Sequence, residues 1–148
     1  MLETFDTASA FNQELGSWNV ANVTTLEEMF ETASAFNQDI DSWNVAQVTT
    51  LAYTFYEASA FNQALGSWNV AYVVTLEGTF ESAPAFNQEL GSWNVAKVTS
   101  PGQGDVYAGS WRRDGDVFHP LLTPVHGKNE NRPTAEVKEE LNTTPNAG

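Results

Sequence analysis

Apolar side chains recur along the first hundred residues every 25 positions, and polar side chains hold fixed places between them. The aromatic ladders are Phe5, Phe30, Phe55 and Phe80; Phe11, Phe36, Phe61 and Phe86; and Trp18, Trp43, Trp68 and Trp93. An aliphatic ladder consists of Leu15, Ile40, Leu65 and Leu90. Because a 25-residue unit is too short to bury its own apolar face, the pattern predicts that four copies stack around one elongated core.

Each unit contains a stretch with the spacing of an amphipathic helix. In the second copy its apolar positions are Leu26, Met29, Phe30 and Ala33. They follow the i, i+3, i+4, i+7 spacing of one helix face. The preceding Thr24 and Thr25 are each followed three residues later by glutamate, as in a capping box. The sequence therefore predicts a two-turn helix in every repeat.

The Phe-Asn-Gln segment of each unit has a different period. In Phe36–Ile40 the side chains alternate between two faces, which is typical of a strand. The four segments are predicted to pair in parallel and in register, about 4.8 Å apart. Gly16, Asp41, Gly66 and Gly91 follow at a turn position, where the sequence is compatible with a positive φ. One short parallel strand and one short helix in each of four 25-residue repeats predict an α/β solenoid like that of leucine-rich repeats.

The repeat pattern divides the chain into three parts. Residues 1–100 form the predicted repeat solenoid, which stops where Pro101 replaces the expected leucine. Residues 101–126 carry enough apolar side chains to act as an irregular capping segment over the last copy. Residues 127–148 are dominated by Lys, Glu, Asn, Thr and Pro, which predicts a flexible tail.

Residues 10–30 read A-F-N-Q-E-L-G-S-W-N-V-A-N-V-T-T-L-E-E-M-F and resemble the BspA-like repeat, also called the mycoplasma domain-of-unknown-function repeat. That family has the pattern F-N-Q-D-I-S-x-W-N-V-S-N-V-T-N-M-x-x-M-F and is grouped with leucine-rich repeats. The resemblance implies adhesion or ligand binding at the cell surface or outside the cell, and not catalysis. Here Thr-Leu stands in place of the family's Asn-Met, and the opening residues lack the features of a signal peptide. Residues 104–111 also resemble half of a MORN repeat.

The charge of the chain is strongly negative, with 19 acidic and 6 basic side chains and a net charge of −13. Lys97 is the one basic residue in the first hundred. This balance disfavours binding of nucleic acid and of anionic membranes. No apolar stretch reaches the length of a membrane span, and the lack of cysteine excludes disulfides, thiolate metal sites and cysteine nucleophiles.

No motif of a known catalytic, cofactor or metal site is present. His119 lies near Asp114 and Asp116, but no nucleophile accompanies them, so a hydrolase is the weakest hypothesis. The carboxylates Glu14 and Asp39 do not follow the spacing of a calcium loop. The repeated asparagines are expected to satisfy backbone groups between copies, in preference to a ligand site. The tryptophans are expected to pack inside, in preference to an exposed sugar-binding platform.

These observations predict a non-catalytic protein-binding or adhesion-type repeat module, without cofactor or metal. The alternative is a structural subunit or linker held permanently in a larger assembly. Candidate partner-binding residues vary among the copies or carry exposed charge; they are Asn22, Gln47, Tyr72, Lys97, Glu28, Tyr53, Tyr56 and Glu14. The partner is expected at the edge of the first repeat, near Phe11 and Leu15, where backbone groups lack a neighbouring strand. Self-association through this edge is a further possibility.

Overall fold

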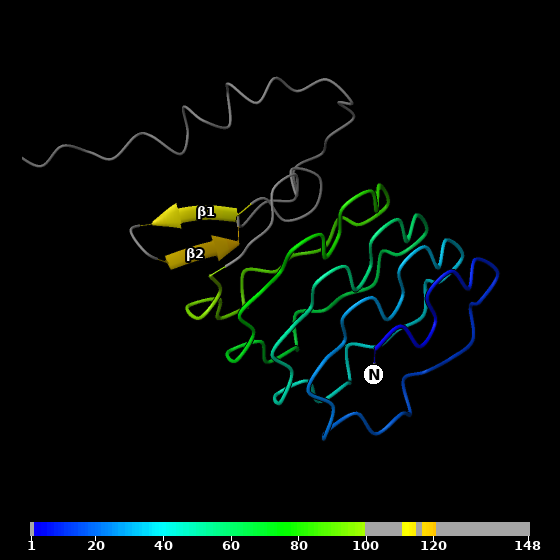
Figure 1. Ribbon diagram of the computed structural model, residues 1–148, viewed down its shortest axis with the longest axis horizontal. Helices are drawn as coiled ribbons and strands as arrows, with labels where there is room; N and C mark the ends of the chain where they lie inside the picture. Colours follow the sequence, from blue (N-terminus) through cyan, green and yellow to red (C-terminus); the bar gives the residue numbers. More distant parts are fainter. Residues whose placement is uncertain (1, 100–110, 115–116, 121–148) are drawn as a thin grey trace, which may run out of the picture.

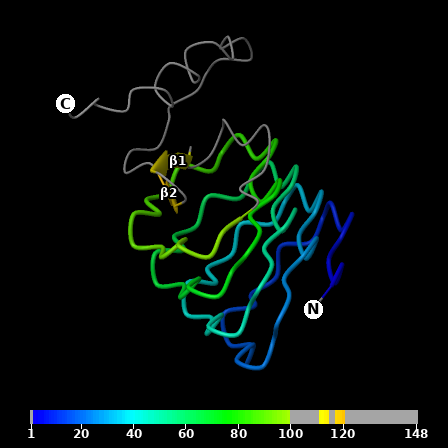
Figure 2. The ribbon, with the colours of Figure 1, turned by 60° about the vertical axis from the view of Figure 1, so that its left-hand side comes forward.

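The computed structural model describes residues 2–99, 111–114 and 117–120. Residues 2–99 wind into coils that correspond to the four repeats and lie one beside the next along a single stack (Figures 1 and 2). Neighbouring coils run in the same direction, because isolated parallel bridges join Thr25 to Thr50 and Thr50 to Thr75. The predicted stacking of four 25-residue copies is therefore observed.

The predicted elements within each copy are not observed. The structure contains no helix in its described residues, and its two strands there lie beyond the repeats. These strands are β1, Trp111–Asp114, and β2, Val117–Pro120. They form an antiparallel hairpin in which Trp111 pairs with Pro120. The expected α/β architecture, with the strand and helix of a leucine-rich repeat in every copy, is therefore wrong.

Two consecutive β-turns replace the predicted helix in the second copy. Met29 N donates to Leu26 O at 3.1 Å, and Ala33 N donates to Phe30 O at 3.1 Å. The third residue of each turn, Glu28 or Thr32, has a φ of 54°, which is the pattern of a type II turn. The turn corners lie outward while the first and last residues are buried, so the turns share the i, i+3, i+4, i+7 spacing of a helix face.

Positive φ values mark the same turns in every copy. They occur at Glu3, Thr7, Glu28, Thr32, Tyr53, Glu57, Gly78 and Ser82. The prediction of a positive φ at Gly16, Asp41, Gly66 and Gly91 is wrong, because none of them is among the described residues with this conformation, and Gly78 is the one glycine there that has it. Gly16 instead allows close approach, since an added Cβ there would lie 3.1 Å from Asp39 O.

Some backbone groups in the turns do not take part in closing a turn. These groups form hydrogen bonds with the next coil instead. Glu28 N donates to Ala52 O at 3.0 Å, and Phe30 N donates to Thr54 O at 2.9 Å. Thr32 N donates to Tyr56 O at 2.7 Å. Alternate residues thus close turns within a coil and join it to the next, which satisfies the backbone without helix or extended strand.

The Phe-Asn-Gln segments do not pair as strands, because asparagine side chains take the place of backbone acceptors. Asn37 N donates to Asn12 Oδ1 at 2.9 Å, and Gln38 Nε2 donates to the same oxygen at 2.9 Å. The arrangement recurs in the next coil, where Asn62 N and Gln63 Nε2 donate to Asn37 Oδ1. The predicted parallel strands are wrong, whereas the predicted bonding role of the asparagines between copies is confirmed.

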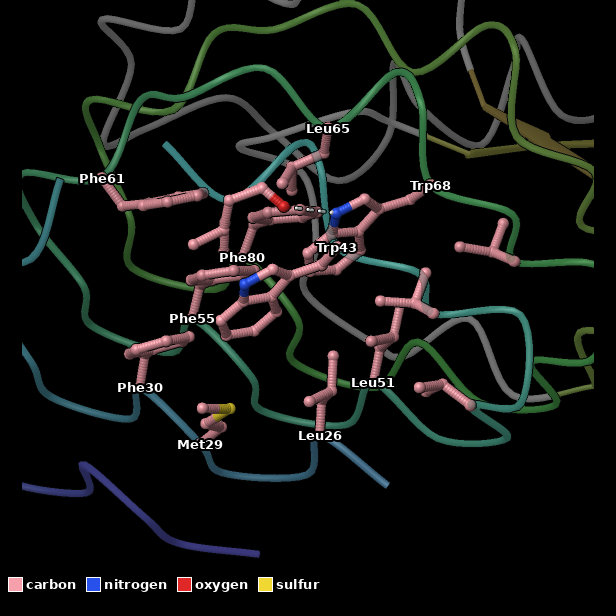
Figure 3. Packing of buried hydrophobic residues seen from close by; sticks show 14 of the residues in the cluster. Leu26, Met29, Phe30, Trp43, Leu51, Phe55, Phe61, Leu65, Trp68 and Phe80 are labelled. Carbon is pink, nitrogen blue, oxygen red and sulfur yellow. Dashed lines mark hydrogen bonds between the residues drawn. The ribbon is translucent and has the colours of Figure 1, made fainter. Parts of the chain in front are cut away.

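Aromatic rings fill the interior of the stack (Figure 3). The Phe55 ring lies 5.5 Å from Phe30 and 5.5 Å from Phe80, nearly parallel to both, and 4.0 Å from Phe61. Trp68 Nε1 donates to Ile40 O at 3.0 Å. The expected burial is confirmed for Phe30, Phe55 and Phe80, for Leu15, Ile40, Leu65 and Leu90, and for Trp43, Trp68 and Trp93. Phe5 is only partly buried, and Trp18 is exposed.

The remaining predictions of organisation fall mainly outside the described residues. Of the expected capping segment 101–126, the structure describes the β1–β2 hairpin alone. The expected flexible tail 127–148 and nearly all of the MORN-like stretch 104–111 lie outside the described ranges.

Candidate binding surface

The outward corners of the turns form one surface that runs along the stack. We call it the turn face; it comprises the corner residues 2–3 and 6–7 of the first coil and the equivalent residues 27–28, 31–32, 52–53, 56–57, 77–78 and 81–82 of the later coils. Its side chains are near neighbours across coils, since Glu28 interacts electrostatically with Glu3 of the preceding coil and Glu31 with Glu57 of the following one. The acidic members are Glu3, Asp6, Glu27, Glu28, Glu31, Glu57, Glu77 and Glu81. The turn face carries no basic side chain.

Burial and like charges raise the pKa values of two carboxyl groups on this face. The pKa of Glu28 is raised first by burial and then by the charges of Glu3, Glu27 and Asp6. The pKa of Glu31 is likewise raised by burial and then by surrounding carboxylates, of which Glu28 is the strongest. Both groups therefore hold their negative charge at a free-energy cost that a bound cation would reduce.

Two tyrosines interrupt the acidic rows in the third coil. Tyr53 Oη donates to Glu77 Oε1 at 2.9 Å, and the Tyr53 and Tyr56 rings meet edge to face at 5.8 Å. Gly78 leaves room for the Tyr53 ring, because an added Cβ would lie 2.3 Å from Tyr53 Cδ1. A hydrogen bond to Glu57 is the largest cause of the raised pKa of Tyr56. The face therefore combines carboxylates with accessible aromatic edges.

The other candidate residues lie on separate rows. Asn22, Gln47, Tyr72 and Lys97 are exposed, and Asn22 lies in a turn closed by Val23 N donating to Val20 O. Lys97 Nζ lies 3.9 Å above the centre of the Tyr72 ring. Glu14 is exposed beside the Asn12 ladder. The structure thus places Glu28, Tyr53 and Tyr56 on the turn face and pairs Lys97 with Tyr72 on another row, away from that face.

Sequence reasoning missed most of the acidic members of the turn face. Glu3, Asp6, Glu27, Glu31, Glu57, Glu77 and Glu81 were not among the candidates. The sequence contained a pattern that could have identified them, because these carboxylates recur at a few equivalent positions of the 25-residue unit. Their closeness depends on the turns, which hold neighbouring coils together through backbone bonds such as Phe30 N to Thr54 O.

The metal-site and hydrolase hypotheses concern side chains away from the turn face. The described part of the chain holds no group of three His, Asp or Glu side chains arranged to bind a metal ion. In the hairpin, His119 pairs with Arg112 and Asp114 pairs with Val117, so the backbone register does not place His119 opposite that aspartate. Within the described ranges, no helix has the length and apolar character needed to span a bilayer.

The raised pKa values of Glu28 and Glu31 contribute stability that increases as the pH falls. A carboxyl group whose pKa is higher in the folded chain binds its proton more tightly there, so folding becomes more favourable as pH falls. The gain begins near the raised pKa of Glu28 and Glu31 and is complete below their ordinary value of 4.5. We expect the double variant Glu28→Gln/Glu31→Gln to melt at a higher temperature than the natural chain at pH 7.

Circular dichroism melts from pH 7 to pH 4 test this dependence. The difference in melting temperature between the double variant and the natural chain should shrink as the pH falls, because Glu28 and Glu31 of the natural chain become protonated. The control is Glu14→Gln/Glu89→Gln, which removes the same charge elsewhere. An equal pH-dependent gain in that control would show that net charge, and not the crowding on the turn face, is responsible.

The described residues define a repeat protein whose coils are built from β-turns and whose outer turns form an acidic face. The chain belongs to a family described as mycoplasma protein of unknown function (DUF285), which matches residues 1–108. No curated protein and no solved structure matches the chain.

Proposed function

We propose that the chain is a non-catalytic protein-binding module whose turn face binds a segment rich in lysine and arginine. One observation carries the proposal: the repeated side chains pack in the core or bond between coils, whereas variable side chains at the turn corners, such as Glu28 and Tyr56, are only partly buried. Such a division allows the outer residues to change without disturbing the stack. The adhesion implied by the BspA-like resemblance is part of this proposal.

The chemistry of the turn face favours a cationic partner. Guanidinium groups form paired hydrogen bonds with carboxylates, and lysine or arginine also binds to the faces of tyrosine rings. Glu28 and Glu31 carry raised pKa values, so a positive charge beside them relieves repulsion as well as adding attraction. The backbone bonds between coils fix the spacing of these groups before binding, which limits the entropy lost on association.

A defined peptide tests this function. The probe is a synthetic peptide of eight arginine and lysine residues separated by glycine and serine, and its comparison peptide carries aspartate and glutamate instead. We expect the basic peptide alone to bind in calorimetric titrations, with affinity falling as salt rises because the charges are screened. Absence of basic-peptide binding at low salt would overturn the proposal.

Matched variants separate the turn face from the overall negative charge. The triple variant Glu28→Gln/Glu31→Gln/Glu57→Gln removes three charges from the turn face. The control Glu14→Gln/Asp39→Asn/Glu89→Gln removes three charges from the separate Asn-Gln row. We expect the turn-face variant to weaken binding about tenfold, a loss of about 1.4 kcal/mol, and the control to weaken it less than twofold. Equal losses would assign binding to net charge alone.

A structural role within a larger assembly is the second proposal. The observation in its favour is the first coil, where Trp18 is 40% exposed although Trp43, Trp68 and Trp93 are buried. Purification of residues 1–148 alone separates the two roles. A soluble monomer with one cooperative melting transition supports the independent module, whereas aggregation reversed by a partner supports the assembly subunit.

A further inference from the structure

The outer side of the first coil differs from the equivalent side of every later coil. Trp18 is 40% exposed, whereas the equivalent Trp43, Trp68 and Trp93 are 3%, 2% and 4% exposed. Phe5 and Phe11 stack at 4.0 Å but are only partly buried, and Leu2 is 54% exposed. In coils two to four, the preceding coil covers these positions. We call this aromatic surface the first-coil face.

The polar groups of the first-coil face match one half of the interface between coils. In the second coil, the carbonyl oxygens of Glu27, Met29 and Glu31 accept hydrogen bonds from the coil before. The equivalent carbonyl oxygens, those of Leu2, Thr4 and Asp6, accept none from any described residue.

Donors on the same face are also unused. Trp43 Nε1 donates to Leu15 O, and Asn37 N donates to Asn12 Oδ1. The equivalent donors, Trp18 Nε1 and Asn12 N, have no acceptor within the described ranges. The first-coil face thus offers both the apolar and the polar half of an interface that occurs three times within residues 2–99.

We infer that the first-coil face binds a coil of this same 25-residue repeat, supplied by another repeat segment. The partner must present backbone N–H donors at three alternate residues, a carbonyl oxygen for the Trp18 indole and an asparagine side-chain oxygen for Asn12 N. This inference rests on continuity with the coil-to-coil interface, and it does not depend on whether the carboxylates of the turn face bind a basic segment.

A second copy of this chain is a poorer occupant. Its fourth coil does not offer the matching apolar surface, because Phe80, Phe86 and Trp93 are already buried. If two first-coil faces packed together, the carbonyl acceptors of Leu2, Thr4 and Asp6 in one chain would face the same acceptors in the other. Glu3 and Asp6 of one chain would also approach Glu3 and Asp6 of the other, and these like charges repel.

The test supplies the partner coil within one chain. A copy of residues 26–50 is fused directly before Met1, so that Thr50 precedes Met1 as it precedes Leu51. Fusion gives the added coil a high effective concentration at the first-coil face. We expect hydrogen exchange, followed by nuclear magnetic resonance, to slow at least tenfold at Asn12 N and Trp18 Nε1.

Two control fusions make the test specific. A scrambled copy of the same 25 residues should leave both exchange rates unchanged. A copy carrying Asn37→Leu should lose the protection of Asn12 N and retain that of Trp18 Nε1, because it lacks the oxygen that Asn12 N needs. Equal protection by the scrambled copy, or unchanged exchange in the matched fusion, would overturn the inference.

Two further measurements separate this inference from its alternatives. Concentration-dependent dimerisation of the unfused chain, with protection of Asn12 N and Trp18 Nε1, would identify a second copy as the occupant and overturn the inference. The unfused chain should bind the basic peptide whether or not coil docking occurs, and the fused chain should bind it at least as tightly, because the added coil brings Glu27, Glu28 and Glu31 to the turn face. A failure of coil docking is therefore distinguishable from a failure of the proposed turn-face function.

Discussion

Replacement of Phe55 with alanine is expected to lower the free energy of unfolding by about 3–5 kcal/mol. The Phe55 side chain is fully buried and lies between Phe30 of the coil before and Phe80 of the coil after, with Phe61 beside it. Its removal leaves a cavity that both neighbouring coils border. The backbone bonds that join those coils, such as Phe55 N to Thr79 O, limit their collapse into the cavity.

Denaturant titrations followed by circular dichroism measure this loss. The matched control is Phe5→Ala, which removes the same side chain from the first coil, where Phe5 is partly exposed and contacts a neighbouring coil on one side. We expect the control to cost less than half as much. Equal losses at Phe5 and Phe55 would contradict the account in which burial between two coils sets the energy.

The sequence predicted the stacking period and most of the buried ladder because both depend on apolar spacing alone. It did not predict the local conformation of Leu26–Ala33. Two successive four-residue turns bury their first and last residues, and this burial reproduces the spacing of one helix face. The distinguishing feature is the positive φ at Glu28 and Thr32, residues with little preference for it, so only the contacts between coils reveal the turns.

The predicted strands failed for a related reason. The alternation in Phe36–Ile40 is real, since Phe36 and Ile40 are buried and Asp39 is exposed. Strand pairing would join backbone to backbone, but here the Asn12 side chain accepts the bond from Asn37 N. The sequence correctly predicted that the asparagines bond between copies. Because their side chains accept the backbone N–H groups of the next coil, those groups cannot form the backbone pairs that a parallel strand requires.

The candidate surface was predicted in part. Glu28, Tyr53 and Tyr56 were selected because they vary among the copies, and the structure places them on the turn face. The contribution of carboxylates from adjacent coils needed the three-dimensional stack, since the electrostatic neighbours of Glu31 include Asp6 and Glu57. Variation identifies exposed positions, but only the register between coils shows which exposed positions act together.

Replacement of Asn37 with alanine is expected to lower the free energy of unfolding by about 1–3 kcal/mol, mainly through lost hydrogen bonds. Asn37 Oδ1 accepts bonds from Asn62 N at 2.9 Å and from Gln63 Nε2 at 3.0 Å. Alanine leaves both partly buried donors without this acceptor, so the second and third coils separate more easily. Denaturant titration measures the loss, and hydrogen exchange should accelerate first at Asn62 N.

Two variants decide whether the side-chain oxygen of Asn37 is the cause. Asn37→Asp keeps an acceptor at Oδ1 and should recover most of the stability that Asn37→Ala loses. Asn44→Ala, in the same coil, removes an oxygen that accepts one exposed bond, from Ala46 N, and should cost less than about 1 kcal/mol. If Asn44→Ala lowered the free energy of unfolding as much as Asn37→Ala, the bonds within turns would contribute as much stability as the asparagine bonds between coils. If Asn37→Asp recovered nothing, the bond between coils would not be what the asparagine contributes, and the repeated Phe-Asn-Gln motif would need another physical explanation.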